Sequence, residues 1–273
     1  MTTHRFRFGV AVGAVPTGKD LLTTAQRIEQ LGYSTMVVAD GLWLPAPFQL
    51  LAAAAAATST LHLGTHVLSA PLRAPATVAQ ETDTLDVLSD HRFELGLGTG
   101  HDGTRADARR LGVPFASRTE RRARIVEVIT AVREQFAVKD REPPRILLAG
   151  VGPRLVSLAA EHADTLALPV GYDQPEDGLE RQVRELRSVT GGRFDDLELA
   201  TNQLIVGDRQ PPAWVPRQFR ELPADSYGRL AGDPGRIADT LRRRRDLLGI
   251  SYVTIPQWHL EDFAPVVELL ADS

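Results

Sequence analysis

A histidine follows a run of glycines near the middle of the chain. The run is Gly96-Leu97-Gly98-Thr99-Gly100, and His101 comes directly after it. Because a histidine changes charge near neutral pH, His101 is a candidate acid or base. Glycine at alternate positions removes the side chains from one face of a strand. We expect internal packing to account for Gly96, and a planar ligand lying on bare backbone to account for Gly98 and Gly100.

A second glycine-rich turn, Gly150-Val151-Gly152-Pro153-Arg154, follows a later apolar run. Proline after glycine is typical of the first turn of a helix. The free N–H groups and positive dipole of a helix start attract anions, and a guanidinium adds a charge-assisted hydrogen bond. The turn therefore predicts a phosphate site, with an ordinary turn and a solvated arginine as the alternative. The predicted phosphate ligands are Gly150, Val151, Gly152 and Arg154.

Three further candidates each follow a β-rich run. Asp40 ends one such run, where its carboxylate either acts in a site or caps the next turn. Trp43 and Trp258 also come after β-rich runs. Their side chains either anchor loops or form walls of a pocket for a flat organic ligand.

His62 and His66 are four residues apart on a predicted strand and therefore share a face. No H-x-H or HExxH motif and no carboxylate cluster accompanies them, so we predict no metal site and keep a two-histidine site as the alternative. The chain has no cysteine, which excludes disulfides, thiolate metal sites, iron–sulfur clusters and a cysteine nucleophile.

The elements that must position these residues alternate along the chain. Short β-rich runs alternate with segments of helical period, and most of the runs are apolar throughout, as in parallel strands covered on both faces. Eight such units predict a (β/α)₈ barrel, with a doubly wound open sheet as the alternative. The eight runs are Phe6–Val12, Ser34–Ala39, Leu61–Leu68, Arg92–Gly98, Arg145–Gly150, Thr165–Val170, Leu197–Val206 and Ser251–Pro256.

The helical segments have recognisable starts and stops. Ser117 and Glu120 have the spacing of a capping box. Asp233 precedes Pro234 as a cap residue precedes a first-turn proline, and Gly249 stands where that helix should end.

Composition narrows the classes of function. The 273 residues are 43% hydrophobic and 24% charged, with a net charge of −4. We therefore expect one soluble domain over residues 1–273 with an extended loop at about 207–232, and no nucleic-acid or membrane partner. Arg242–Arg245 is expected to be a solvated helix face. Residues 1–8 lack the apolar stretch of a signal peptide, which predicts a cytoplasmic protein.

Several segments together resemble the luciferase-like monooxygenase superfamily, in order along most of the chain. They are Leu31-Gly32-Tyr33 with Val37–Asp40, Leu63-Gly64-Thr65 through Pro71–Pro75 to Leu85-Asp86, Arg92–Gly100, Gly150–Arg154 with Leu158–Asp164, and Gly232–Ala238 with Leu248–Val253.

The resemblance implies a barrel that binds the deazaflavin coenzyme F420 or FMN, and the sequence looks most like the F420-dependent branch. In that family the ring lies against a bulge after strand 3 that often holds a non-proline cis peptide, here placed at Ser69-Ala70. The expected cofactor contacts are Asp40, Ser69, Ala70, Gly98, Thr99, Gly100, Gly150, Val151, Gly152 and Arg154. The expected catalytic residues are His101 and Asp40, and the expected substrate-binding residues are Trp43 and Trp258.

One departure from the family concerns the proton-transferring group. Many relatives carry Asp-His at the end of strand 2, whereas this chain has Asp40-Gly41. His101 would replace the histidine, or the substrate would need no acid. The family also implies a homodimer, for which the alanine-rich helix Leu51–Ala57 is suited.

The expected function is hydride transfer between F420 and a small organic substrate. The alternatives are an FMN-dependent monooxygenase, a non-catalytic flavin- or deazaflavin-binding protein, and a metal-dependent hydrolase that uses His62 and His66.

Overall fold

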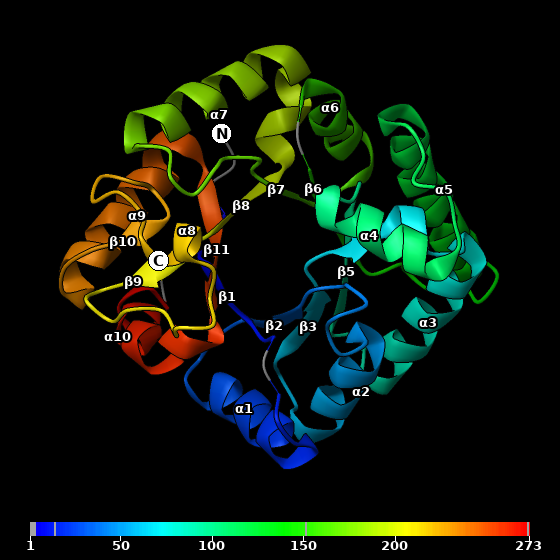
Figure 1. Ribbon diagram of the computed structural model, residues 1–273, viewed down its shortest axis with the longest axis horizontal. Helices are drawn as coiled ribbons and strands as arrows, with labels where there is room; N and C mark the ends of the chain where they lie inside the picture. The colour runs from blue at the N-terminus through cyan, green and yellow to red at the C-terminus, as the bar shows by residue number, and fades with distance from the viewer. Residues whose placement is uncertain (1–3, 14, 151, 272) are drawn as a thin grey trace.

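A closed barrel of parallel strands forms the centre of the protein (Figure 1). The computed structural model describes residues 4–13, 15–150, 152–271 and 273. Within them, eight strands pair in parallel around the ring, and the short β4 continues the path of β3 along β5. The predicted barrel is confirmed, and the open sheet is excluded because β3 pairs with β5 and closes the ring. The strands of the barrel are β1 (Arg7–Ala11), β2 (Thr35–Val38), β3 (His62–Thr65), β4 (Leu68–Ser69), β5 (Phe93–Gly98), β6 (Arg145–Ala149), β7 (Thr165–Ala167), β8 (Glu198–Asn202) and β11 (Ile250–Pro256).

Helices surround the barrel and connect its strands. The capping signals are confirmed: the side chains of Ser117 and Asp233 accept hydrogen bonds from N–H groups in the first turns of α5 and α9, and Gly249 ends α9 with φ 82°. The helices are α1 (Gly18–Gln30), α2 (Pro47–Ala57), α3 (Pro75–Leu88), α4 (Asp102–Leu111), α5 (Arg118–Ala137), α6 (Pro153–His162), α7 (Glu176–Thr190), α8 (Arg217–Arg220), α9 (Pro234–Leu248) and α10 (Leu260–Leu270). None of these described helices combines the length and apolarity needed to cross a bilayer.

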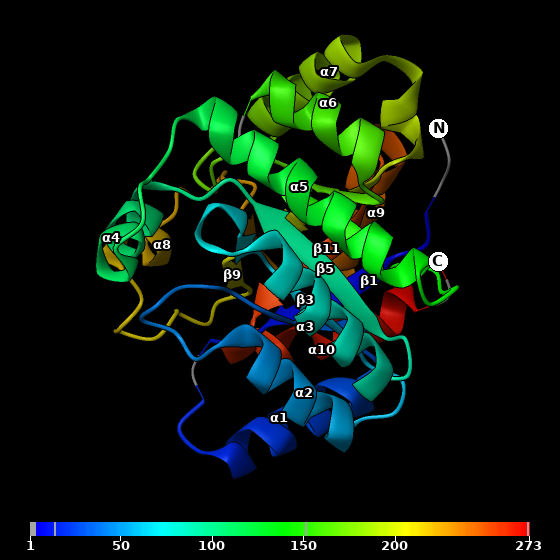
Figure 2. The same cartoon turned by 90° about the vertical axis from the view of Figure 1, so that its right-hand side faces the viewer.

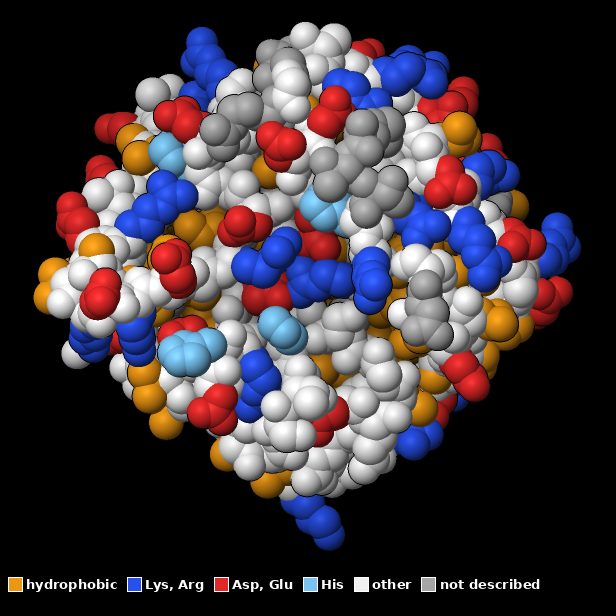
Figure 3. All heavy atoms as spheres, turned by 180° about the vertical axis from the view of Figure 1, so that it is seen from behind, with side chains coloured by type: hydrophobic (Ala, Val, Ile, Leu, Met, Phe, Trp, Pro, Cys, Tyr) orange, Lys and Arg blue, Asp and Glu red, His pale blue; other side chains and the backbone are white. Residues whose placement is uncertain are grey.

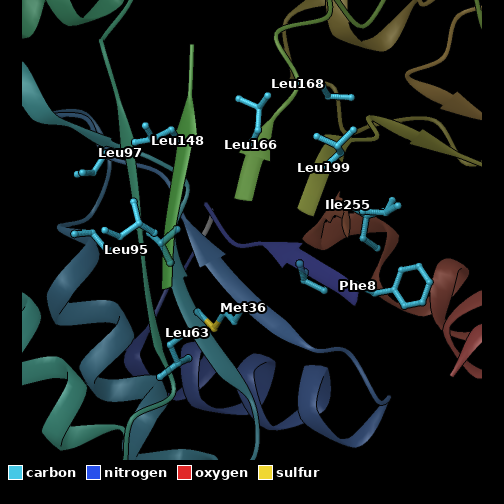
Figure 4. Packing of buried hydrophobic residues seen from close by; sticks show 14 of the residues in the cluster. Phe8, Met36, Leu63, Leu95, Leu97, Leu148, Leu166, Leu168, Leu199 and Ile255 are labelled. Carbon is cyan, nitrogen blue, oxygen red and sulfur yellow. The ribbon is translucent and has the colours of Figure 1, made fainter. Parts of the chain in front are cut away.

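Buried side chains lie on both faces of the strands. Leu148, Leu166 and Leu199 belong to the large apolar cluster between the strands and the helices (Figure 4). The alternate positions, including Leu147 and Tyr252, form a smaller cluster on the other face. Burial on both faces explains why the strands are apolar throughout rather than alternating.

The segment predicted as an extended loop at 207–232 is partly ordered into secondary structure. It contains α8 and the short β10 (Arg229–Leu230), which pairs with β9 (Ile205–Val206). Arg244 holds the segment by donating to the backbone oxygen of Tyr227 while it pairs with Glu176. The prediction that Arg242–Arg245 is a solvated face is therefore wrong for Arg244, whose side chain is buried.

Charged side chains close the amino-terminal end of the barrel. Arg7 pairs with Glu94 and donates to Glu198, and His62 lies 3.1 Å from Glu94. Figure 3 shows basic, acidic and histidine side chains gathered near the middle of this face. Burial by itself would raise the pKa of Glu94, but the hydrogen bond with His62 and the positive charge of Arg7 hold it below its ordinary value.

This depressed pKa predicts how stability depends on pH. A carboxylate with a lowered folded-state pKa stabilises the fold above its unfolded value, here 4.5, and that stabilisation is lost as the pH falls through the folded value. Glu94→Gln should lower the free energy of unfolding at pH 7 by about 3 kcal/mol and flatten its fall below pH 4.5. Urea unfolding of the wild type and of Glu94→Gln, from pH 7 to below pH 4.5, measures the effect. If the free energy of unfolding fell with pH equally in both proteins, the prediction would be contradicted.

Candidate active site

A cavity of about 800 Å³ lies at the carboxyl-terminal mouth of the barrel, on the strand ends from β2 to β6. α4 and α8 both lie at this end of the molecule (Figure 2). Active sites of such barrels form at this end, and ligand pockets are typically of this size. Its lining residues are Ala39, Asp40, His66, Val67, Leu68, Ser69, Gly98, Thr99, Gly100, His101, Asp102, Arg105, Phe115, Ala116, Ser117, Arg118, Arg121, Arg122, Ala149 and Gly150.

Internal packing already requires the two glycines that sequence reasoning assigned to a ligand. A Cβ atom on Gly98 would lie 2.6 Å from Cγ2 of Val67. Gly100 has φ +71°, and a Cβ there would lie 2.9 Å from the side chain of Thr104. Both glycines line the cavity. Contacts within the protein already require their lack of a side chain, and the contact with a planar ligand stays a prediction.

Asp40 is held in place by strong partners. Its two carboxylate oxygens accept hydrogen bonds from Arg73 Nη2 and Nε, at 2.7 and 2.9 Å. The oxygen Oδ2 also accepts from the backbone N–H of Ser69, at 3.0 Å. Asp40 therefore ties the end of β2 to the cavity wall at Ser69, and this bidentate pairing occupies its carboxylate.

The bulge after β3 lies earlier than predicted. The cis peptide bond joins His66 and Val67, not Ser69 and Ala70. Pairing with β5 resumes at Leu68, so Ser69 is already part of β4. Ala70 is fully buried and does not belong to the cavity lining, so its predicted contact with the cofactor is not supported.

Two histidines line the cavity. Nδ1 of His101 accepts a hydrogen bond from the backbone N–H of Gly103 and caps α4, and the residue is exposed. Nε2 of His66 is buried and has no hydrogen-bond partner among the described residues. Burial lowers the pKa of His66, so its imidazole is neutral at pH 7.

The structure places several predicted site residues elsewhere. Arg154 is exposed on the first turn of α6, five residues beyond the end of β6, and does not belong to the described lining of the cavity. Gly152 is the N-cap of that helix, and Val151 lies outside the described residues. Trp43 is 78% exposed, and Trp258 packs edge-on against Trp214, 5.4 Å between ring centroids. Neither tryptophan belongs to the described lining of this cavity.

Sequence reasoning missed a group of arginines. Arg105, Arg118, Arg121 and Arg122 line the outer part of the cavity, beside Phe115. A signal was present, since arginines cluster on both sides of Phe115 and immediately after the predicted capping box.

The two-histidine metal site is not formed. His62 is the first residue of β3 and His66 follows its last residue, so that about 13 Å of extended chain separates them. Among residues 4–13, 15–150, 152–271 and 273, no group of three or more histidine, aspartate or glutamate side chains could hold a metal ion.

Comparison with known proteins shows to which family this chain belongs. The model of the luciferase-like monooxygenase family matches residues 1–214. The chain belongs to this family. Among its curated relatives is an F420-dependent glucose-6-phosphate dehydrogenase of Intrasporangium calvum, 29% identical over 87% of this chain and 88% of that protein. The protein of the same name from Kribbella flavida is 26% identical over 96% of this chain and 89% of its own length.

A solved structure shows the same barrel. An F420-dependent secondary alcohol dehydrogenase, in complex with an F420-acetone adduct, matches with a TM-score of 0.74 over 98% of both chains. At 17% sequence identity this likeness establishes the fold.

Proposed function

We propose that this protein is an oxidoreductase that moves hydride between F420 and a small organic substrate. The observation that carries the proposal is the cavity at the barrel mouth, which joins bare backbone at Gly98 and Gly100 to the bulge at His66–Val67. Full-length relatives named as F420-dependent dehydrogenases support this choice of cofactor.

The lining residues fit a flat tricyclic ring with an anionic side chain. Val67, Gly98 and Ser69 would hold the ring against the strand ends. Thr99, Gly100 and Gly150 would contact the side chain of the coenzyme next to the ring. When bound, the coenzyme supplies the hydride chemistry, and the protein supplies orientation and a site shielded from water.

The chain offers two groups for the accompanying proton. His101 is exposed and lines the cavity, and its Nδ1 already accepts a hydrogen bond from Gly103. The proton would therefore be exchanged at Nε2. Asp40 would orient the ring site through Ser69 rather than transfer a proton, since Arg73 occupies its carboxylate.

The assembly and location of the enzyme are part of the same proposal. α2 presents small side chains beside its buried residues Phe48, Leu51 and Ala54, which suits close packing in a homodimer. We also place the enzyme in the cytoplasm. Trp43 remains our candidate for the substrate side of the mouth, and Trp258 would act with Trp214 from the other side.

A fluorescence titration of the purified protein with F420, and separately with FMN, tests the cofactor. We expect a micromolar or lower Kd for F420 and much weaker binding of FMN. Tight binding of FMN alone would instead favour an oxygen-using monooxygenase, a reaction class that the family description includes. Binding of neither would overturn the proposal. A protein that binds F420 but oxidises or reduces no substrate in a screen would be a non-catalytic binding protein.

A further inference from the structure

The outer wall of the mouth cavity carries an excess of positive charge. We call Arg105, Arg118, Arg121 and Arg122 the arginine wall; all four line the cavity and come from α4 and the first turns of α5. Asp102 lies in the same lining and contributes a negative charge. The carboxylate of Asp40 is also there, but Arg73 neutralises it. Four positive charges therefore face one uncompensated negative charge among the described lining residues.

The members of the arginine wall differ in their partners. Arg121 has a structural role, because its Nε and Nη1 donate to the backbone oxygens of Thr99 and Ala116, at 2.8 and 2.7 Å. Arg122 donates to the neutral hydroxyl of Thr119 at 3.2 Å. Among the described residues, no acidic side chain pairs with Arg105, Arg118 or Arg122.

An aromatic side chain fixes the position of two of these guanidinium groups. The guanidinium carbon of Arg121 lies 4.2 Å from the ring centroid of Phe115, and that of Arg105 lies 4.8 Å from it. Stacking on one ring holds like charges close together. Burial, and then repulsion by the charges of Arg118, Arg105 and Arg122, lowers the pKa of Arg121 below its ordinary value.

Two helices also begin at this wall. α4 has ten residues and starts at Asp102, while α5 has twenty and starts at Arg118. Both starting residues line the cavity. The positive ends of two helix dipoles therefore add to the field of the arginines.

We infer that the arginine wall binds a multiply charged anionic group, a phosphate or a set of carboxylates, belonging to a ligand that enters the mouth cavity. The positive charges of the unpaired guanidinium groups and of the two helix starts would attract and hold this anionic group. The inference rests on the proposed function only in taking the mouth cavity as the ligand site. It differs from the phosphate site expected at residues 150–154, since it uses α4 and α5 and not Arg154. The substrate class is therefore acidic if the cofactor does not itself fill this wall.

Calorimetric titration of the cofactor-free protein with pyrophosphate tests the anion site directly. We expect measurable binding that weakens as the salt concentration rises, because ions screen exposed charges. The double variant Arg118→Gln, Arg122→Gln should weaken it by about tenfold or more, since charge-assisted hydrogen bonds are lost. Arg121 stays unchanged in this test because it supports the backbone at Thr99.

Arg110→Gln is the matched control. Arg110 is exposed near the end of α4, and it does not belong to the cavity lining, so its loss removes a positive charge from the same helix without touching the site. Thermal unfolding of each variant establishes that it is folded. No pyrophosphate binding by the wild type, or equal affinities in the wild type and the double variant, would overturn the inference. A loss with Arg110→Gln as large as that of the double variant would also overturn it, because binding would then follow overall charge.

A second titration identifies the source of the anionic group. If pyrophosphate competes with F420, the arginine wall holds the acidic part of the cofactor. If pyrophosphate still binds to the F420 complex, the wall holds an acidic substrate, and the double variant should raise the KM for the substrate while leaving the Kd for F420 unchanged. A protein that binds pyrophosphate but never F420 would overturn the proposed cofactor and leave the anion site standing.

Discussion

Gly96→Ala should prevent the barrel from closing normally. A Cβ atom at this position would lie 1.9 Å from the backbone oxygen of Thr65, and no side-chain rotation can relieve a clash with backbone. The same two residues hold β3 and β5 together, because Thr65 Oγ1 donates to the oxygen of Gly96 and accepts from its N–H, both at 2.9 Å. We expect a loss of more than about 3 kcal/mol in the free energy of unfolding, or insoluble protein.

A graded set of glycine variants controls for the substitution itself. A Cβ on Gly64 would lie 3.3 Å from a side-chain atom of Val37, so Gly64→Ala should cost less than Gly96→Ala. Nothing lies within 4 Å of a Cβ on Gly18, at the start of α1, so Gly18→Ala should change stability by less than about 0.5 kcal/mol. Urea unfolding of the three variants gives the order. A Gly96→Ala protein as stable as the wild type would contradict the closure argument.

Asp40→Ala should weaken F420 binding by about tenfold or more and also destabilise the fold. The change removes the bidentate partner of Arg73 and the acceptor for the N–H of Ser69. Among the described acidic side chains, Arg73 would keep only Glu81, at 3.7 Å. Removing one partner of a largely buried ion pair costs about 3–5 kcal/mol. The cavity wall at Ser69 would lose its fixed position. Fluorescence titration and thermal unfolding measure the two effects.

Asp40→Asn tests whether Asp40 only positions the cavity wall or also takes part in the reaction. The amide keeps one oxygen for Ser69 but loses the negative charge opposite Arg73, so we expect an intermediate Kd for F420. If Asp40 acts only through Ser69, kcat at saturating F420 should stay close to that of the wild type. A large fall in kcat with an unchanged Kd would show instead that the carboxylate takes part in the reaction.

The sequence predicted the elements of the fold well because their signals are local. Apolar runs buried on both faces became the strands, and the cap residues Ser117 and Asp233 start the helices where they were expected. The glycine run after Phe93 was correctly placed at the cavity, since strand direction alone puts its carboxyl end at the barrel mouth.

These local signals could not predict contacts between residues that lie far apart in the sequence. Asp40 meets Arg73 only because the chain passes around α2 and returns along β4, a separation of 33 residues. The bulge was misplaced from His66–Val67 to Ser69–Ala70 because the point where β4 resumes pairing depends on β5 and not on the bulge's own residues.

Which charged side chains line the cavity also depends on how distant parts of the chain are arranged in the fold. Arg154 and the arginines around Phe115 are equally basic in the sequence, but the fold brings Arg118 and Arg122 into the cavity lining and leaves Arg154 outside it. By itself, then, the sequence determined that a (β/α)₈ barrel would form and which strand ends would meet at its mouth. Only the closed tertiary structure decided which charges face the ligand, because that depends on helix orientation relative to the barrel rather than on the order of residues.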